Sequence, residues 1–188
     1  ELEVDGFADN PPDRCYHCKT AILQKVREAA EQVDTVYIAE GSNVDDDGDY
    51  RPGKRAVQEA GVISPLKEAG LTKAEIRQLS KEMGLATWDK PSFACLASRF
   101  AYEEPITAEK LRMVELAEKF LREHGFSQYR VRMHGSMARV EVLPEDLERF
   151  LDPKLRQDFT GHMKDLGFTY TALDLDGYRT GSMNATLK

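Results

Sequence analysis

Three cysteines constrain this 188-residue chain more than any other feature of its sequence. Cys15 and Cys18 have the C-x-x-C spacing that lets two thiolates bind one metal centre. Cys95 lies far along the chain and can reach them only through the fold. An odd and sparse set of cysteines argues against a disulfide framework and favours a reducing compartment such as the cytoplasm. We therefore expect the thiols to serve a metal or the chemistry of a site.

Several interpretations of these cysteines fit the spacing. A C-x-x-C pair can be half of a zinc site, a redox dithiol or part of an iron–sulfur site. Zinc needs a fourth ligand, and His17 is poorly aimed for that role if both thiols point the same way. A redox dithiol leaves Cys95 unexplained. Cys95 could instead be a small buried hydrophobic residue, although Ser98 and Arg99 are unusual neighbours for a core cysteine.

Composition excludes some classes of partner. The formal net charge of −7 argues against a broad surface that coats nucleic acid. No apolar run approaches the roughly 18–20 residues of a membrane span. The first residues show no basic region followed by an apolar stretch, so no secretory signal is visible. We expect neither a membrane nor a nucleic acid as the partner.

The first half, residues 1–90, has the rhythm of a parallel α/β sheet. Hydrophobic periodicity and β-branched runs predict a helix, a strand, a helix, a strand and a helix at residues 15–33, 35–39, 51–60, 62–66 and 73–83. Thr72 and Glu75 form a capping-box pattern, and Gly84 ends the last helix. The apolar positions expected to face inward are Ile22, Val26, Ala29, Ala30 and Val33 in the first helix, and Ile76, Leu79 and Met83 in the last.

A Gly-Ser-Asn turn and an acidic run follow the strand expected at residues 35–39. In open α/β sheets, ligands bind just past the carboxyl ends of strands. Residues 41–49 are therefore a candidate nucleotide loop. A solvated acidic turn fits the same residues.

Residues 91–106 interrupt this rhythm and carry Cys95. We interpret them as a loop that joins two subdomains, a place where active sites often lie. Residues 107–188 then read as helix, strand, strand, helix, helix and strand, which predicts a small α+β unit.

The two strands of that unit carry an arginine face. The natural register of the hairpin pairs Val131 with Val140 and Arg132 with Arg139. Two opposed cations repel unless an anion lies between them, and Glu141, opposite Arg130, balances only one charge. Arginines on one strand face could bind phosphate or carboxylate in a bidentate manner, whereas a solvated polar face is the commoner explanation of such a pattern.

Four segments in the correct order resemble the LarE family. They are NPPDRCYHCK at residues 10–19, EGSNVDD at 40–46, KPSFACLASRF at 90–100 and GYRTGSMN at 177–184. These enzymes are ATP-dependent sulfur transferases that help to build the nickel-pincer nucleotide cofactor. The resemblance spans nearly the whole chain.

The resemblance implies a PP-loop ATP pyrophosphatase domain with a Rossmann-like parallel sheet, followed by a small α+β sulfur-transferase domain. The family begins with a strand and a Ser-Gly-Gly-x-Asp-Ser phosphate loop, and no such motif occurs in this sequence. We therefore expect a strand–helix–strand–helix opening of about 70–80 residues to precede Glu1.

The resemblance also implies a reaction. ATP with Mg adenylates a carboxylate of a pyridinium dicarboxylate mononucleotide, and sulfur then displaces AMP to give a thiocarboxylate. Family members with only the cysteine that matches Cys95 give up its sulfur and are left with dehydroalanine. Other members have three cysteines, as this chain does at Cys15, Cys18 and Cys95. These cysteines resemble the ligands of a 4Fe-4S cluster with one open iron, so we expect such a cluster for this chain.

Site residues follow from the same resemblance. The adenine nucleotide would contact Gly41, Ser42, Asn43 and Asp45. The substrate's phosphate or carboxylates would contact Ser98, Arg99, Arg130 and Arg132. The family suggests a homo-oligomer, possibly a hexamer. A tRNA-thiolating PP-loop enzyme and a non-catalytic zinc-binding or iron-binding module remain as alternatives.

Overall fold

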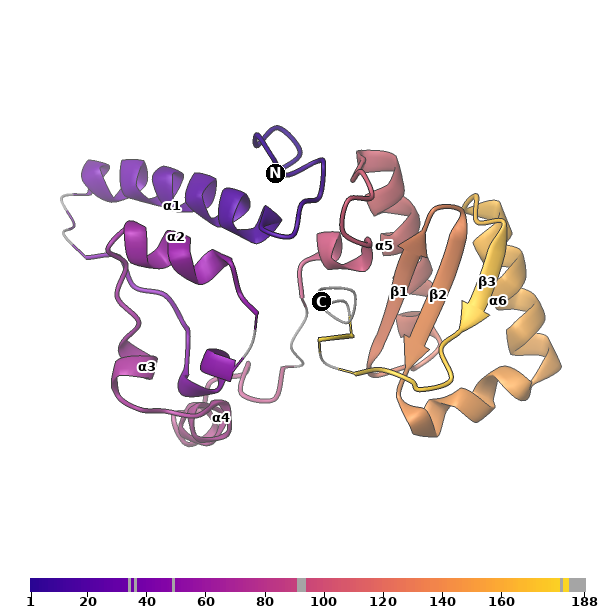
Figure 1. Ribbon diagram of the computed structural model, residues 1–188. Coiled ribbons are helices and arrows are strands. Elements are labelled where there is room, and N and C mark those ends of the chain that lie inside the picture. The colour runs from indigo at the N-terminus through magenta and orange to yellow at the C-terminus, as the bar shows by residue number, and fades with distance from the viewer. Residues whose placement is uncertain (34, 36, 49, 91–93, 180, 183–188) are drawn as a thin grey trace. The chain divides into compact units, whose positions relative to one another are not determined.

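The computed structural model describes residues 1–33, 35, 37–48, 50–90, 94–179 and 181–182 (Figure 1). The chain divides into two compact units. The first unit consists mainly of Asp13–Ser92, and the second consists mainly of Phe93–Lys188 together with Ala8–Pro12. The boundary falls inside the segment 91–106 that the sequence marks as the joining loop.

Helices make up most of the first unit, at the positions that periodicity and capping predict. Thr72 accepts a hydrogen bond from the Glu75 amide at 3.3 Å, while the Glu75 carboxylate accepts one from the Thr72 amide at 2.8 Å. This reciprocal pair is the predicted capping box. Gly84 follows the helix with a φ of 73°. The elements are α1 (Arg14–Gln32), the 3-10 turn η1 (Val44–Gly48), α2 (Gly53–Glu59), α3 (Pro65–Glu68) and α4 (Lys73–Glu82).

The two buried strands predicted for the first unit are reduced to one parallel bridge between Ala39 and Ile63. The prediction for residues 62–66 is wrong in its second half, because Pro65 begins α3. A proline has its φ fixed near the helical value, which suits the first position of a helix. Val36 lies outside the described residues. Among the residues described in this unit, no parallel sheet of the predicted kind forms.

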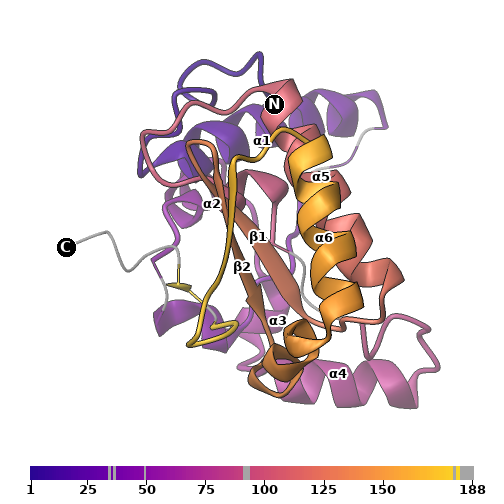
Figure 2. The same ribbon diagram turned by 90° about the vertical axis from the view of Figure 1, so that its right-hand side faces the viewer.

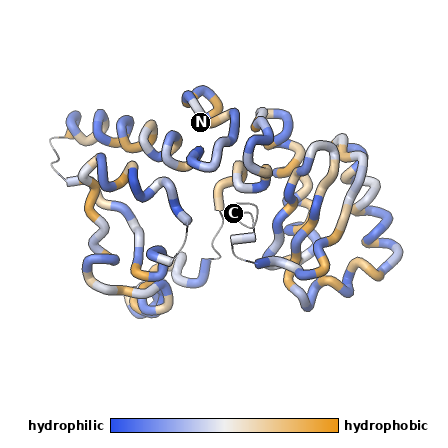
Figure 3. Tube along the Cα trace, viewed as in Figure 1, coloured by the Kyte–Doolittle hydropathy of each residue, from blue (hydrophilic) through white to orange (hydrophobic). Residues whose placement is uncertain are grey.

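The core of the first unit is small. It contains Leu23, Ala56 and Val62. The predicted inward faces are partly wrong, because Ile22 and Val26 are 42% and 40% exposed and Leu79 and Met83 are 43% and 75% exposed. Helix α2 packs against α1, with Leu23 and Ala56 in the shared core, and hydrophobic and hydrophilic residues alternate along α1 (Figure 3). Periodicity locates an apolar face but not the element that covers it.

The second unit has the predicted order of elements. Strands β1 and β2 are antiparallel and β2 and β3 are parallel, so the sheet is mixed, with order β1-β2-β3. Helices α5 and α6 lie side by side against it (Figure 2). The fold is therefore α/β with a small mixed sheet. The elements are the 3-10 turn η2 (Leu96–Arg99), α5 (Ala108–Glu123), β1 (Tyr129–His134), β2 (Met137–Val142), the 3-10 helix η3 (Pro144–Leu151), α6 (Pro153–Asp165) and β3 (Tyr170–Leu173).

The hairpin of the second unit has the predicted register. Val131 pairs with Val140, and Arg132 pairs with Arg139. Both valines are fully buried, on the apolar face that the alternation predicts. The helices contribute buried side chains to the same core, among them Val114, Ala117, Leu121, Phe159 and Met163.

Candidate active site

Cys95 lies at the start of η2, and its side chain is exposed. The Ser98 amide donates to the Cys95 carbonyl at 2.9 Å, which closes the turn. Phe100 is fully buried and forms a parallel bridge with Met133 of the edge strand β1. We call Cys95 and η2 together the Cys95 turn. The interpretation of Cys95 as a buried hydrophobic residue is therefore wrong, because a rigid turn presents the thiol to solvent.

Arg99 anchors this turn from inside. It is 2% exposed, and its Nε and Nη2 donate to the two carboxylate oxygens of Glu118 at 2.7 and 2.9 Å. Its Nη1 points to the Cys95 carbonyl at 3.3 Å and the Ser98 hydroxyl at 2.9 Å. A buried guanidinium is tolerated only when it is paired and its donors are used, and both conditions hold here.

Glu118 is a residue of this site that the sequence analysis missed. Its Oε1 also accepts the Val131 amide of the edge strand β1 at 3.0 Å, so it links α5, β1 and the Cys95 turn. A signal was present, because Glu118 occupies an apolar-face position between Val114, Ala117 and Leu121. A carboxylate at a core-facing helical position needs a buried partner.

Arg132 provides a second anchor. Its Nε and Nη2 donate to Oε1 and Oε2 of Glu141 at 2.6 and 2.9 Å. Its Nη1 donates to the Ser98 carbonyl at 2.9 Å. The Cys95 turn is thus held by two bidentate arginine–carboxylate pairs, one from α5 and one from the hairpin.

The polar face of the hairpin is buried, so the alternative of a solvated polar face is wrong. Arg130 is 3% exposed, donates to the Tyr129 carbonyl at 2.6 Å and lies 5.0 Å from the centre of the Tyr178 ring. Burial, followed by the nearby charge of Arg99, lowers the pKa of Arg130. The anion between Arg132 and Arg139, which the register demands, is the Glu141 side chain.

Asn10, in the segment at residues 10–19, holds the chain that follows the Cys95 turn. Asn10 belongs to the second unit, has a φ of 57° and is fully buried. Its amide group donates to the carbonyls of Ala101 and Glu104 at 2.5 and 3.1 Å. The segment before the C-x-x-C pair therefore holds the chain that follows the Cys95 turn. Of the other motif residues, Pro91, Ser92, Phe93, Thr180, Met183 and Asn184 lie outside the described residues.

The candidate nucleotide loop forms a closed acidic turn in the first unit. The Ser42 amide donates to Glu40, the Asn43 amide to Asp46 and the Asp45 amide to the Asn43 side chain, at 3.0–3.2 Å. Gly41 is exposed, and an added Cβ would meet nothing within 4 Å. Burial alone would raise the pKa of Glu40, but hydrogen bonds from Ser42 and Ser64 outweigh it and lower that pKa. The loop is pre-formed by its own carboxylates.

Cys15 and Cys18 occupy the first turn of α1, three residues apart, which places them on one side of the helix. Cys15 is exposed and Cys18 is half-buried. The Nε2 atom of His17 lies 3.5 Å from the Asp13 carboxylate, and the His17 ring packs against Gly6. His17 therefore has contacts of its own that do not involve the two thiols.

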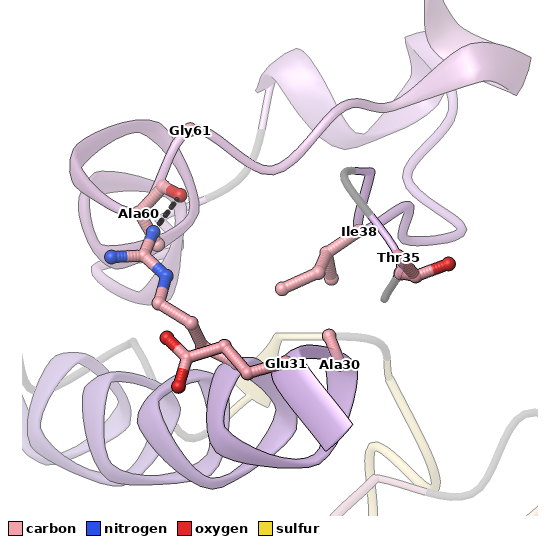
Figure 4. Close-up of a pocket in the computed structure, with 7 residues that line it drawn as sticks. Ala30, Glu31, Thr35, Ile38, Ala60 and Gly61 are labelled. Carbon is pink, nitrogen blue, oxygen red and sulfur yellow. Dashed lines mark hydrogen bonds between the residues drawn. The ribbon is translucent and has the colours of Figure 1, made fainter. Parts of the chain in front are cut away.

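A cavity in the first unit lies away from the candidate nucleotide loop and from Cys15 and Cys18. A cavity of about 100 Å³ lies between α1 and the end of α2, where Arg27 donates to the Ala60 carbonyl at 2.6 Å (Figure 4). Nucleotide and cofactor pockets are typically about 300–1,000 Å³, so this cavity is too small for one. It is lined by Arg27, Ala30, Glu31, Thr35, Ile38, Ala60 and Gly61.

Within each unit, no three His, Cys, Asp or Glu side chains among the described residues gather as ligands for one metal ion. None of the helices in the described part of the chain is both long and apolar enough to span a membrane.

Comparison with known proteins reveals clear relatives. The chain is 38% identical over 190 residues to pyridinium-3,5-bisthiocarboxylic acid mononucleotide synthase of Lactiplantibacillus plantarum, which covers 99% of this chain and 67% of the relative. It is 41% identical to an uncharacterized protein of Synechocystis, over 100% of this chain and 70% of the relative. It is 30% identical to an uncharacterized protein of Methanocaldococcus jannaschii, over 95% and 69%. No protein-family model matches the chain.

Proposed function

The chain belongs to the LarE family, and from this premise we propose that it is an ATP-dependent sulfur transferase of nickel-pincer nucleotide biosynthesis. Its substrate would be a pyridinium dicarboxylate mononucleotide, and its product the corresponding thiocarboxylate. The observation that carries this proposal is the Cys95 turn. An exposed thiol on a turn held by two buried ion pairs is a sulfur atom kept accessible and fixed in position.

The proposed reaction has two steps. A carboxylate oxygen of the substrate attacks the α-phosphorus of ATP, and the bond to pyrophosphate breaks. The resulting acyl-adenylate is then attacked at its acyl carbon by a sulfur nucleophile, and AMP leaves with the former carboxylate oxygen. Adenylation is needed because a free carboxylate is a poor acyl acceptor, and Mg bound to ATP would offset the phosphate charge.

Arginines would supply the recognition of the anionic substrate. Ser98 is part of the Cys95 turn, and Arg130 lies near enough to Arg99 of that turn to feel its charge. We assign Ser98 and Arg130 to direct contact with phosphate or carboxylate. Arg99 and Arg132 already hold Glu118 and Glu141, so we assign them to fixing the turn and to the positive potential around it. A guanidinium in a desolvated setting attracts an anion more strongly than one in water.

The nucleotide would be bound by the first unit through Gly41, Ser42, Asn43 and Asp45. The Ser42 and Asn43 amides are held by carboxylates and the Asp45 amide by the Asn43 side chain, so we expect contacts to the adenosine part rather than to the triphosphate. The exposed Gly41 leaves room for a base or ribose to approach the backbone. A triphosphate would meet repulsion from the acidic residues that follow.

Cys15, Cys18 and Cys95 would be the ligands of a 4Fe-4S cluster. The first two fit this role because their thiols share one side of a helix terminus, and Cys95 fits because its thiol is exposed. Such a cluster, when bound through three thiolates, supplies sulfide from its fourth iron. The protein residues would then bind and orient the adenylated substrate and exclude water from it.

The direct test is product formation. Anaerobically reconstituted protein is incubated with ATP, Mg and the pyridinium dicarboxylate mononucleotide, and the products are analysed by mass spectrometry. We expect AMP, pyrophosphate and a product in which sulfur replaces a carboxylate oxygen. Cys95→Ala should abolish the thiocarboxylate, whereas Ser127→Ala on the surface should not. AMP release without any sulfur-containing product would contradict the proposal.

The source of the sulfur is decided by the intact mass of the protein after turnover. If Cys95 itself were the donor, its thiolate would form a thioester with the acyl group, and loss of the α-proton with cleavage of the Cβ–S bond would leave dehydroalanine. The protein would then lose the mass of one hydrogen sulfide at Cys95. We expect an unchanged mass, because all three cysteines are present.

A further inference from the structure

Glu141 is the most completely enclosed charged residue of the hairpin, with 0% of its surface exposed. It lies opposite Arg130 in the strand ladder, yet its carboxylate is engaged by Arg132, two residues further along β1. Oε1 accepts from Arg132 Nε at 2.6 Å and Oε2 from Arg132 Nη2 at 2.9 Å. This fork-to-fork geometry fixes the plane of the guanidinium as well as its position.

The orientation of Arg132 determines what its remaining nitrogen can reach. With Nε and Nη2 held by Glu141, Nη1 donates to the Ser98 carbonyl at 2.9 Å. The Ser98 amide in turn donates to the Cys95 carbonyl at 2.9 Å. A continuous series of contacts therefore runs from the buried carboxylate on β2 to the backbone of Cys95.

Neighbouring groups confine Glu141 to this role. Arg139 approaches Oε1 at 3.2 Å, but its Nη1 is bonded to Asp174, so it does not draw the carboxylate away from Arg132. The Ser182 hydroxyl donates to Oε1 at 3.0 Å and accepts from Arg132 Nη2 at 2.7 Å. The Ser182 hydroxyl thus bridges Arg132 and Glu141, and Arg139 shares Oε1 with them, while Oε2 accepts from Arg132.

We propose that Glu141 is a positioning residue that sets the Cys95 turn through Arg132. This inference rests on the proposed function only in taking Cys95 as a residue of the active site. Glu141 touches neither the substrate nor Cys95. Removing its charge leaves Arg132 without its counter-ion, loosens the contact to the Ser98 carbonyl and lets the turn open more often.

The test compares Glu141→Gln with Glu145→Gln, a matched control on the exposed surface of η3 in the same unit. Hydrogen exchange is measured for the peptide that covers residues 94–100. We expect the Ser98 and Phe100 amides of Glu141→Gln to exchange about tenfold faster, the effect of losing roughly one net hydrogen bond. The control should match the wild type. Cys95 should also change its rate of alkylation by iodoacetamide, while Cys15 and Cys18 serve as internal controls in the other unit.

Steady-state kinetics give an independent readout. The kcat for thiocarboxylate formation should fall in Glu141→Gln, while KM for the mononucleotide changes less. Exchange that is unchanged in the Cys95 turn, or raised equally throughout the second unit, would show a merely structural role and overturn the proposal. If wild-type protein makes no thiocarboxylate but the exchange result holds, the proposed function fails and the positioning role stands.

A buried carboxylate cannot always be neutralised without unfolding, so a second variant is needed. Arg132→Met combined with Glu141→Met replaces both charges by apolar chains of similar length and leaves no unpaired charge. It should fold and show the same faster exchange at Ser98 and Phe100. A folded double variant with wild-type exchange in the Cys95 turn would also overturn the proposal.

Discussion

The two units differ in how far they bury apolar and charged side chains. The second unit encloses a continuous core between its sheet and helices, and it buries arginine–carboxylate pairs beside that core. Among the described residues of the first unit, the apolar core cluster consists of Leu23, Ala56 and Val62. Ion pairs of this unit such as Lys67–Asp47 lie at the surface, although Asp46, which pairs with Arg51, is buried.

Exposed apolar residues occur in both units. Val33, Tyr37 and Met83 of the first unit are 72%, 77% and 75% exposed. Large apolar residues of the second unit are exposed to a similar degree, at 72%, 67% and 84% for Leu151, Tyr170 and Leu175. The units therefore differ in how much apolar surface they bury and not in how much they expose.

The largest expected effect comes from breaking a buried ion pair. Glu118→Gln should lower the free energy of unfolding by about 3–5 kcal/mol, because Arg99 would remain buried without a counter-ion. Asp47→Asn, which removes a surface pair of the first unit, should change it little. Urea unfolding followed by far-UV circular dichroism measures both. Equal losses would show that the two units do not differ in how they use charge.

Matched leucine truncations test the difference between the cores. Leu121→Ala in α5 removes a fully buried side chain and should cost about 3 kcal/mol or more. Leu79→Ala in α4 should cost within roughly 0.5 kcal/mol, because that side chain is already 43% exposed. The first unit can be followed separately through Trp88, the only tryptophan of the sequence. A Leu79→Ala cost as large as that of Leu121→Ala would disprove the contrast.

Loss of a helix cap should lower the free energy of unfolding by a similar amount in both units. Thr72 in the first unit and Thr107 in the second each accept a backbone amide three residues ahead, at 3.3 and 3.2 Å. Thr72→Ala and Thr107→Ala should each cost about 1 kcal/mol, because capping is local and does not depend on the core. Thermal unfolding of both variants measures this. A cap that costs nothing in the first unit would mean that α4 does not fold cooperatively with the rest of it.

The pH dependence of the free energy of unfolding should differ between the units, with a smaller effect than the substitutions above. Burial, followed by Arg139, lowers the pKa of His134 below its ordinary value of 6.5. The unfolded chain then takes up the proton first, so stability present above about pH 6.5 should be lost as the pH falls through the folded-state pKa. His134→Gln should flatten this slope in urea unfolding between about pH 7 and pH 5. The charged groups that act on His134 are Arg139, Glu104, Arg132 and Glu141.

Two carboxylates of the first unit should lose their contribution to stability at lower pH. Hydrogen bonds from Lys67 and Lys54 lower the pKa of Asp47, and hydrogen bonds from Thr72 lower that of Glu75. Both groups contribute stability above their unfolded pKa values, near pH 4, and that contribution is lost as the pH falls below them. Urea unfolding of the first unit, followed by Trp88 fluorescence, measures this loss, and an unchanged stability below about pH 4 would contradict it.

The sequence alone predicts what local chemistry determines. The capping box at Thr72 and Glu75 and the register of the hairpin are confirmed. Each depends on residues within a few positions of one another. Strands are less predictable, since among the described residues of the run at 35–39 only Ala39 forms a bridge.

Burial of the arginine face could not be predicted in the same way. It depends on Tyr178 and Ser182, which lie about 50 residues beyond Arg132 in sequence. Periodicity identifies the polar face of the hairpin but carries no information about a distant segment that covers it. Glu118 was missed although the sequence carries a signal for it, because an acidic residue on an apolar helix face requires a buried partner.

The central claim is that cysteines from both units serve one function. Iron is measured after anaerobic reconstitution of the wild type and of Cys15→Ala, Cys18→Ala and Cys95→Ala. The account predicts about four irons per chain in the wild type and loss of the brown chromophore in every variant, Cys95→Ala in the second unit as much as Cys15→Ala in the first. Full iron content and activity in Cys15→Ala would contradict it.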